Sequence, residues 1–429
     1  SIDNDLNRVF WGLTFLNNEA ITDIAQLNLK KTETKYFKYL ENELGEIQFE
    51  GMPTDKEAGA VKVKLENIFV PLHLSQSKQS RKKSEFDLEE TTREAIGDIL
   101  SKNSRLAILA KPGGGKSTLI KRIAIAYAFP ERREKINDKL PDKEWFPIFL
   151  RCRELGEKVT LSITEIINGI PARAEINSCS GDFSLLVSKA LQNGNALLLI
   201  DGLDEIAEDK NRISFVNQLR TFIATYPTIN IIVTSREAGF RVVAGTLATY
   251  CENYIVSNLI GSEIQELCLK WHKAIIDESE NTVKEANKLS ELILKDSRIK
   301  VLAENPLLLT TLLFVKRWAG YLPTKRSVLY QEMISAYNKK EISHFKDTSR
   351  KFIELGEDID RLLATRQEFL LGRWVADAAQ YGKTDEEKAY YKRNAREIIT
   401  TWHKGGGELT DYSNRQWNGL MRTYYLQRW

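Results

Sequence analysis

The sequence has few of the features on which membrane, secreted and metal-bound proteins depend. None of its apolar runs approaches the ~18 residues of a membrane span, so we expect no membrane partner. Its four cysteines are scattered along 429 residues, without the close spacing of metal ligands. It also lacks a signal peptide. These absences predict a cytoplasmic protein with reduced thiols.

Three further absences concern the organisation of the chain. The first residue is Ser1 rather than Met, so we expect that an effector domain lies outside this sequence. There is no internal repeat of the solenoid type. The net charge of +3 neither favours nor excludes a nucleic-acid partner. With 42% hydrophobic and 28% charged residues, the composition is that of ordinary globular domains.

The sequence does contain a glycine-rich segment, KPGGGKST, at Lys111–Thr118. It follows an apolar run that we interpret as a buried strand, Leu106–Ala110, and it leads into a helical pattern at Ser117–Tyr127. Glycines let the backbone curl so that N–H groups point inward, and a helix N-terminus adds partial positive charge. The segment follows the P-loop pattern G-x-x-x-x-G-K-[ST], except that Ala110 replaces the first glycine.

We therefore predict that this segment binds nucleotide phosphates. Lys116 would reach the β- and γ-phosphates, and the Ser117 hydroxyl would hold Mg²⁺. The residues expected to surround the phosphates are Pro112, Gly113, Gly114, Gly115, Lys116, Ser117 and Thr118.

A second motif, Ala196–Glu205, is typical of a Walker B strand. Its apolar residues predict a strand buried on both faces, and its end presents Asp201 at the sheet edge where nucleotides bind. Asp201 can hold Mg²⁺ directly or through water. Asp204 and Glu205 follow one turn later, and we predict that one of them orients or deprotonates the attacking water.

A third apolar strand, Ile229–Thr234, ends in Ser235 and Arg236. In P-loop NTPases with an additional strand between the P-loop and Walker B strands, the end of this strand senses the γ-phosphate. The guanidinium of Arg236 suits that role because it can make forked contacts with phosphate.

The order of elements predicts an α/β P-loop NTPase core with a parallel sheet of the additional-strand type. Strand patterns alternate with helical ones up to residue 256, and helical patterns dominate from residue 260 onward. Three local expectations accompany this order: a strand-like stretch at Val61–Leu74, a helix at Leu88–Leu100 and a capping box at Ser262–Gln265.

With these motifs the chain resembles the NACHT-type NTPases of the STAND class, relatives of animal NOD-like receptors. The resemblance covers roughly residues 60–340. The segments that carry it are Ala110–Thr118, Leu198–Glu205, Val233–Arg236, Asn305–Leu309 and Leu322–Tyr330. The leucine-rich repeats and the Phe-x-His stretch of such proteins are absent.

The resemblance implies four parts. These are an N-terminal helical segment (1–60), a NACHT nucleotide-binding domain (61–258, with a linker at 75–85), helical domain 1 (259–321) and a winged-helix-like or helical domain that is incomplete here (322–429). The C-terminal parts would follow the α/β core as helical domains.

The resemblance also implies a signalling switch. ADP would lie between the core and the helical segment, with Val70 near the adenine and Pro306 near the base and sugar. A trigger would promote exchange for ATP and self-oligomerisation, followed by slow hydrolysis. Bacterial members act in defence against phages, so we expect a prokaryotic source and a trigger derived from a phage or another pathogen.

Two alternatives stay open at this point. A ring-forming AAA+ motor or loader would hydrolyse ATP rapidly and would need an arginine finger, which the sequence does not identify. A winged-helix regulator that binds DNA would use its nucleotide only structurally, and it would retain DNA in a salt-dependent way.

Overall fold

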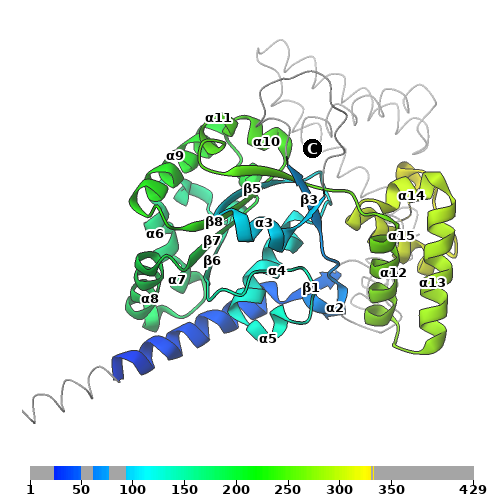
Figure 1. Cartoon of the computed structure of the whole chain (residues 1–429), viewed down its shortest axis with the longest axis horizontal. Helices are drawn as coiled ribbons and strands as arrows, with labels where there is room; N and C mark the ends of the chain where they lie inside the picture. The colour runs from blue at the N-terminus through cyan, green and yellow to red at the C-terminus, as the bar shows by residue number, and fades with distance from the viewer. Residues whose placement is uncertain (1–23, 50–60, 77–92, 330–331, 333–429) are drawn as a thin grey trace, which may run out of the picture. The chain divides into compact units, whose positions relative to one another are not determined.

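The computed structural model describes residues 24–49, 61–76, 93–329 and 332 (Figure 1). The chain divides into two compact units, Ser1–Asn338 and Lys339–Trp429, and every described residue belongs to the first. Apart from residues 322–329 and 332, the predicted winged-helix-like domain at 322–429 lies outside the described residues, as does most of the predicted linker at 75–85.

The first unit is an α/β domain followed by a set of helices. Its strands are β1 (Glu46–Phe49), β2 (Val61–Lys64), β3 (His73–Gln76), β4 (Glu94–Ala95), β5 (Arg105–Leu109), β6 (Phe146–Arg151), β7 (Ala196–Asp201), β8 (Asn230–Ser235) and β9 (Glu252–Val256). Its longer helices are α4 (Lys116–Ala128), α8 (Ser180–Asn193), α9 (Asp209–Thr225), α12 (Gly261–Ile275), α13 (Glu280–Lys295) and α15 (Pro306–Ala319), together with a helix at residues 24–44. Its shorter helices are α2 (Leu65–Ile68), α3 (Ile96–Lys102), α5 (Pro130–Arg133), α6 (Ile163–Asn168), α7 (Ile170–Arg173), α10 (Glu237–Arg241), α11 (Ala244–Leu247) and α14 (Ser297–Ala303).

Seven strands form the central sheet, in the order β4-β3-β9-β5-β8-β7-β6. The five strands from β9 to β6 are parallel, whereas β3 pairs antiparallel with both β9 and β4. Strand β8 lies between β5, which precedes the glycine-rich loop, and β7, which ends in Asp201. This confirms the predicted α/β P-loop core with an additional strand.

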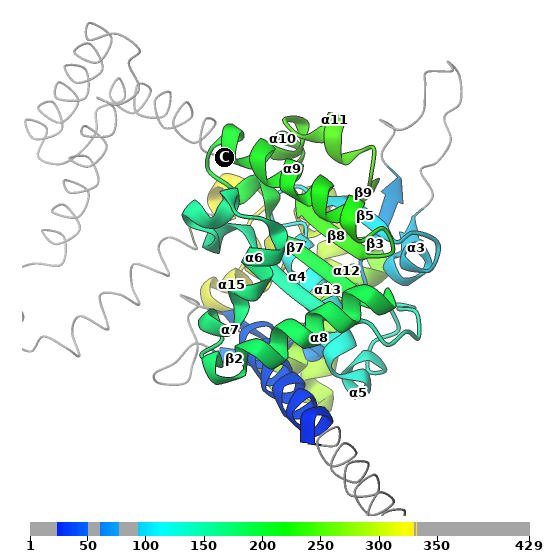
Figure 2. The same ribbon diagram turned by 90° about the vertical axis from the view of Figure 1, so that its left-hand side faces the viewer.

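Both faces of the sheet are covered, as its mostly apolar central strands require. Every residue of β7 and β8 is buried. Helix α4 contacts β6, β7 and β8, and α8 contacts β7. In Figure 2 the green helices α6 to α9 lie in front of the strands. A layered arrangement of this kind brings the carboxyl ends of parallel strands to one edge, where ligands bind.

Three local expectations prove wrong in detail. The stretch at 61–74 is not one strand, since α2 separates β2 from β3. In the described part of 88–100, residues 94–95 form β4 and helix α3 begins only at Ile96, because Glu94 and Ala95 pair with β3. The predicted capping box is displaced: the Glu263 carboxylate accepts the Ile260 N–H at 2.8 Å, at the start of α12.

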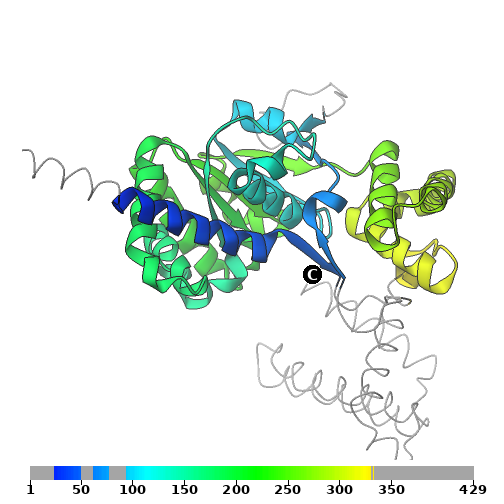
Figure 3. The ribbon, with the colours of Figure 1, turned by 90° about the horizontal axis from the view of Figure 1, so that it is seen from below.

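The helix at residues 24–44 packs against the β6 edge of the α/β domain. Tyr36 is fully buried, stacks on Phe146 with ring centroids 5.6 Å apart and donates its hydroxyl to the Pro147 carbonyl at 3.1 Å. Figure 3 shows this helix in dark blue, leading into β1. The described part of the predicted N-terminal segment is thus helical, with β1 at its end.

Helices α12 to α15 pack on one another after β9, as the helical patterns predict. Helix α15 begins at Pro306, a position where the missing N–H of proline costs nothing, and ends before Gly320 in the left-handed conformation. Within the described ranges, no helix combines the length and apolar character that crossing a membrane requires. All four cysteines are buried and free of disulfides.

Candidate nucleotide-binding site

The glycine-rich loop joins the end of β5 to the start of α4, as the motif predicts. Gly113 and Gly115 have φ values of +74° and +90°, which L side chains rarely adopt. The Ala110 N–H donates to the Ser235 carbonyl at 3.2 Å, so the loop leaves the sheet beside the end of β8. The result is a curled backbone at the positively charged N-terminus of a helix.

Close contacts also require glycine in this loop. A Cβ on Gly115 would lie 2.8 Å from Leu72 Cδ1, and one on Gly113 would lie 2.7 Å from Leu307 Cβ. Such distances are shorter than carbon atoms tolerate. The loop is therefore held between the segment before β3 and the start of α15.

The Walker B aspartate lies directly beside the P-loop serine. Asp201 Oδ1 accepts the Ser117 hydroxyl at 3.1 Å and the Thr234 hydroxyl at 2.7 Å. Thr234 Oγ1 in turn accepts the Gly202 N–H at 2.9 Å. Two chain segments that are far from Asp201 in sequence thus hold its carboxylate in place.

The oxygen atoms of Ser117 and Asp201 suit a magnesium ion. Mg²⁺ prefers hydroxyl and carboxylate oxygens at 2.0–2.1 Å, so two neighbouring ligands of an octahedral ion lie about 3 Å apart. The separation of 3.1 Å between Ser117 Oγ and Asp201 Oδ1 matches that spacing. These two residues would hold the ion, which would neutralise phosphate charge.

Asp204 and Arg236 form a second paired unit at the ends of β7 and β8. The Asp204 carboxylate accepts the Arg236 backbone N–H at 2.9 Å and lies 3.2 Å from the Arg236 guanidinium. The Asp204 side chain is only 10% exposed, whereas that of Arg236 is 32% exposed and reaches the cavity described below. In this structure Asp204 therefore orients Arg236.

Glu205 has different surroundings from Asp204. It lies on a one-turn helix, Leu203–Glu205, where burial raises its pKa above the ordinary value. The ammonium of Lys116 opposes that rise, while Asp201 and Asp204 add to it. A carboxyl group whose pKa is raised in this way is better suited to accept a proton.

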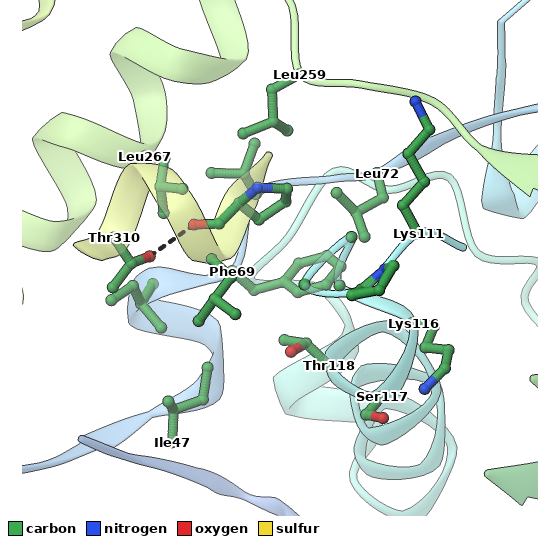
Figure 4. A pocket seen from close by; sticks show the side chains of 18 of the residues that line it. Ile47, Phe69, Leu72, Lys111, Lys116, Ser117, Thr118, Leu259, Leu267 and Thr310 are labelled. Carbon is green, nitrogen blue, oxygen red and sulfur yellow. Dashed lines mark hydrogen bonds between the residues drawn. The ribbon is translucent and has the colours of Figure 1, made fainter. Parts of the chain in front are cut away.

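A cavity of about 390 Å³ opens at the glycine-rich loop, within the range of small-molecule sites. Figure 4 shows Lys116, Ser117 and Thr118 on one side of it and apolar side chains on the other. The polar lining comes from the loop residues, Arg236 and Thr310. Its apolar lining is Ile47, Ile68, Phe69, Val70, Leu72, Leu259, Leu267, Pro306 and Leu307.

The cavity unites residues that the sequence analysis named separately. Val70 and Pro306, proposed for the base and sugar, line it, as does the whole run from Pro112 to Thr118. Asp201 is hydrogen-bonded to this lining through Ser117, and Asp204 through Arg236. These predicted residues are thus brought to one place, with a polar side and an apolar side, whereas Glu205 is not among the residues that line the cavity.

Sequence reasoning missed several residues of this site. Phe69, Leu72 and Leu259 carry no motif and reach the cavity through tertiary packing alone. Thr234 belonged to a recognised segment, and its place on the strand beside Walker B was a usable signal for its contact with Asp201. Asn305 was noted only as part of a motif, yet it contacts the loop.

Comparison with known proteins identifies two regions of the chain. Residues 104–275 match the NACHT domain family, a range that contains all five parallel strands from β5 to β9. Residues 314–429 match the family described as the alpha-N-acetylglucosaminidase (NAGLU) C-terminal domain.

Individual relatives match only parts of the chain. Human alpha-N-acetylglucosaminidase is 36% identical over 104 residues, which are 24% of this chain and 14% of the human protein. GTPase Der of Actinobacillus pleuropneumoniae is 32% identical over 132 residues, which are 30% of this chain and 24% of that GTPase. The chain thus spans less than a quarter of the length of either relative.

A similar solved structure is the Walker-type ATPase PABY2304 of Pyrococcus abyssi. It is 12% identical, covers 70% of this chain and 86% of its own, and has a TM-score of 0.34. The family match and the strand order both concern the region that holds the glycine-rich loop. Residues 104–275 of this chain therefore form a NACHT domain, a P-loop NTPase core.

Proposed function

We propose that this chain is a STAND-type signalling ATPase, which ADP holds in a resting form and ATP converts to an active, oligomeric form. One observation carries the proposal. The P-loop and Arg236 line one cavity, the Walker B aspartate is hydrogen-bonded to that lining through Ser117, and the first turn of α15 forms part of the opposite wall. A nucleotide in that cavity would contact both the NACHT core and the helical segment.

The division of the lining favours an adenine nucleotide lying across the cavity. Phosphates would lie against the glycine-rich loop and Lys116, and the base would lie on the apolar side between Val70 and Pro306. A bound magnesium ion would supply charge neutralisation at the phosphates. Ser117 and Asp201 would keep it in position.

Hydrolysis would depend on Glu205 and Arg236. Glu205 would orient a water molecule and accept its proton, and its raised pKa suits this task. Arg236, held by Asp204, would bind the γ-phosphate oxygens. We propose slow turnover, because a switch has to keep each nucleotide state long enough to signal.

The switch needs two arrangements of the helical segment. ADP favours the arrangement in which α15 closes the cavity, and a trigger has to bind the open form better by several kcal/mol for a nearly complete shift. We propose that opening exposes a surface for self-association. The setting would be the cytoplasm of a prokaryote, in defence against phages, with an effector domain outside this sequence.

The first experiment identifies the nucleotide that the purified protein carries. Chromatography of the supernatant after denaturation should yield ADP, and calorimetry of the stripped protein should show ADP and ATP binding in preference to GDP and GTP. Lys116→Ala should abolish nucleotide binding, because it removes the ammonium group that would contact the phosphates. Undiminished ATP binding by Lys116→Ala would overturn the site, and preferential GTP binding would overturn the adenine assignment.

The same preparation separates the switch from its alternatives. Rapid hydrolysis without any trigger would support an AAA+ motor instead. Salt-dependent retention on DNA, with nucleotide bound but not exchanged, would support a DNA-binding regulator. A size increase in light scattering that requires ATP and a trigger is the result expected of the switch.

The match of residues 314–429 suggests a chemistry for the trigger. We propose that this region takes part in sensing and binds a glycan with a terminal α-linked N-acetylglucosamine, the group that the name of the human relative contains. The test is a glycan array probed with the full chain, with α-linked N-acetylgalactosamine as the matched control. Equal signals for both sugars, or for neither, would contradict this assignment.

A further inference from the structure

We infer that Asn305 is a positioning residue, which fixes the glycine-rich loop in its phosphate-binding form and couples nucleotide retention to the helical segment. The inference rests on the proposed nucleotide site. Its basis is one side chain with two simultaneous hydrogen bonds. Asn305 Oδ1 accepts the Leu308 N–H at 3.1 Å and so caps α15, while Asn305 Nδ2 donates to the Pro112 carbonyl at 3.0 Å.

A second bond ties the next loop peptide to the same helix. The Leu307 N–H donates to the Gly113 carbonyl at 3.2 Å. The N–H of that peptide, on Gly114, donates to the Lys111 carbonyl at 3.0 Å. Both ends of this peptide are therefore held, and its plane cannot rotate without losing a hydrogen bond.

The bond from Asn305 orients the peptide that carries the Gly113 N–H. In a trans peptide the C=O and N–H groups point in opposite directions. Because the Pro112 carbonyl is directed to Asn305 on α15, the Gly113 N–H is directed away from α15. An amide donor that is already oriented binds an anion without the cost of ordering the loop.

The loop and the start of α15 lie too close together for a side chain at position 113. A Cβ on Gly113 would lie 2.7 Å from Leu307 Cβ and 2.9 Å from Asn305 Oδ1. Gly113 also has a positive φ of +74°, which the loop must keep while α15 lies against it. The loop and the first turn of α15 thus fit as one unit.

With this arrangement, nucleotide affinity depends on the position of α15. When α15 leaves the loop, the Pro112 and Gly113 carbonyls lose their partners and the loop peptides become free to rotate. Nucleotide release then becomes faster, and by linkage a bound nucleotide holds α15 in place.

The test compares one substitution that keeps a helix cap with another that removes one. Asn305→Asp keeps an oxygen that caps α15 but removes the Nδ2 donor to Pro112. Ser279→Ala removes the cap of α13, where Ser279 Oγ accepts the Thr282 N–H at 3.3 Å, and it has no partner in the loop. The measured quantities are the dissociation rate of a fluorescent ADP analogue, chased with unlabelled ADP, and the melting temperature without nucleotide.

We expect Asn305→Asp to release the analogue about two- to tenfold faster than the parent, as the loss of one hydrogen bond predicts. Its nucleotide-free melting temperature should fall no further than that of Ser279→Ala, since both substitutions remove hydrogen bonds of similar strength. Ser279→Ala should lower the melting temperature and leave the release rate unchanged.

Two outcomes would overturn the inference. One is an unchanged release rate in Asn305→Asp, and the other is equal acceleration by Ser279→Ala, which would mean that general loosening of the helices is the cause. A parent protein that retains no analogue would instead refute the nucleotide site itself, and the inference with it.

Discussion

Asp204 and Glu205 are adjacent in the chain, but they have different contacts. Asp204 is bound to the backbone and the guanidinium of Arg236. Glu205 lies near Lys116 with a raised pKa. The sequence offered both as the residue that activates water, and the structure favours Glu205 because Asp204 is already engaged.

Substitution of Glu205 should separate binding from hydrolysis. We expect Glu205→Gln to bind ATP like the parent but to hydrolyse it at least about 100-fold more slowly, because general-base catalysis contributes at least that factor. Single-turnover hydrolysis with prebound ATP measures the effect. Asp204→Asn is the matched comparison, and a larger loss there than in Glu205→Gln would contradict the assigned roles.

The raised pKa of Glu205 also predicts how hydrolysis responds to pH. A general base works when ionised, so the rate should fall as the pH drops through a pKa above the ordinary 4.5. Rates measured at fixed ionic strength from pH 4.5 to 8 should show this acid limb. A limb at or below the ordinary pKa would show that another group is titrating.

The raised pKa of Glu205 affects stability in the opposite direction from hydrolysis: stability falls, rather than rises, as the pH increases. Because folding raises the pKa of Glu205, the ionised form is disfavoured in the nucleotide-free fold, and stability is lost as the pH rises above the ordinary value. Glu205→Gln should therefore melt at a higher temperature than the parent at pH 7.5. The difference should shrink near pH 4.5, and a melting temperature below that of the parent at pH 7.5 would contradict the burial argument.

At the scale of elements, a buried ion pair links α5 to the segment that forms the apolar side of the site. Arg132 on α5 donates to both carboxylate oxygens of Glu66 on α2, at 2.5 to 3.2 Å, and to the Gly45 carbonyl at 2.9 Å. Phe69 and Val70, which line the cavity, follow α2 directly. The pair therefore supports the wall of the nucleotide site.

Breaking this pair should weaken both the fold and the site. Glu66→Gln leaves Arg132 with only the partly exposed Glu41 as a charge partner, at 3.3 Å, so we expect a loss of about 3 kcal/mol in unfolding free energy. Denaturant unfolding measures the loss. Lys38→Gln, which removes an exposed pair with Glu41, is the control and should cost less than about 0.5 kcal/mol.

Glu66 also gives this element an acid-sensitive contribution to stability. Burial raises its pKa, but the hydrogen bonds and charge of Arg132 outweigh burial and bring the pKa below 4.5. The stabilisation is thus complete above the ordinary pKa and is lost as the pH falls through the lowered value. It acts in the opposite direction from Glu205, at the other side of the site.

At the scale of the whole molecule, the cavity joins the sheet, the segment around α2 and the helices after β9. A ligand that contacts all three should stabilise them together. We expect ADP with Mg²⁺ at 100 times its dissociation constant to add about 2.7 kcal/mol to the unfolding free energy, a rise of several degrees in melting temperature. The same additions to Lys116→Ala should leave its melting temperature unchanged.

Much of the core was predictable because its signals are local. The glycine-rich loop, the apolar strands that end in Asp201 and Arg236, and the start of α15 at Pro306 each depend on a few adjacent residues. The errors arose where pairing decides the structure. Glu94 and Ala95 became a strand because β3 lies beside them, and α2 interrupts a stretch whose composition suits a strand.

The kinds of groups at the candidate site follow from short stretches of sequence: a cation and a hydroxyl after a glycine loop, an acid after one buried strand and a guanidinium after another. Which of these groups meet depends on the fold, because hydrogen bonds such as Asn305 to Pro112 join residues 193 positions apart. The fold also paired Asp204 with Arg236, and it completed the apolar wall with residues that carry no motif, such as Phe69 and Leu259. Motifs are short-range, whereas the packing that aligns them depends on the whole domain.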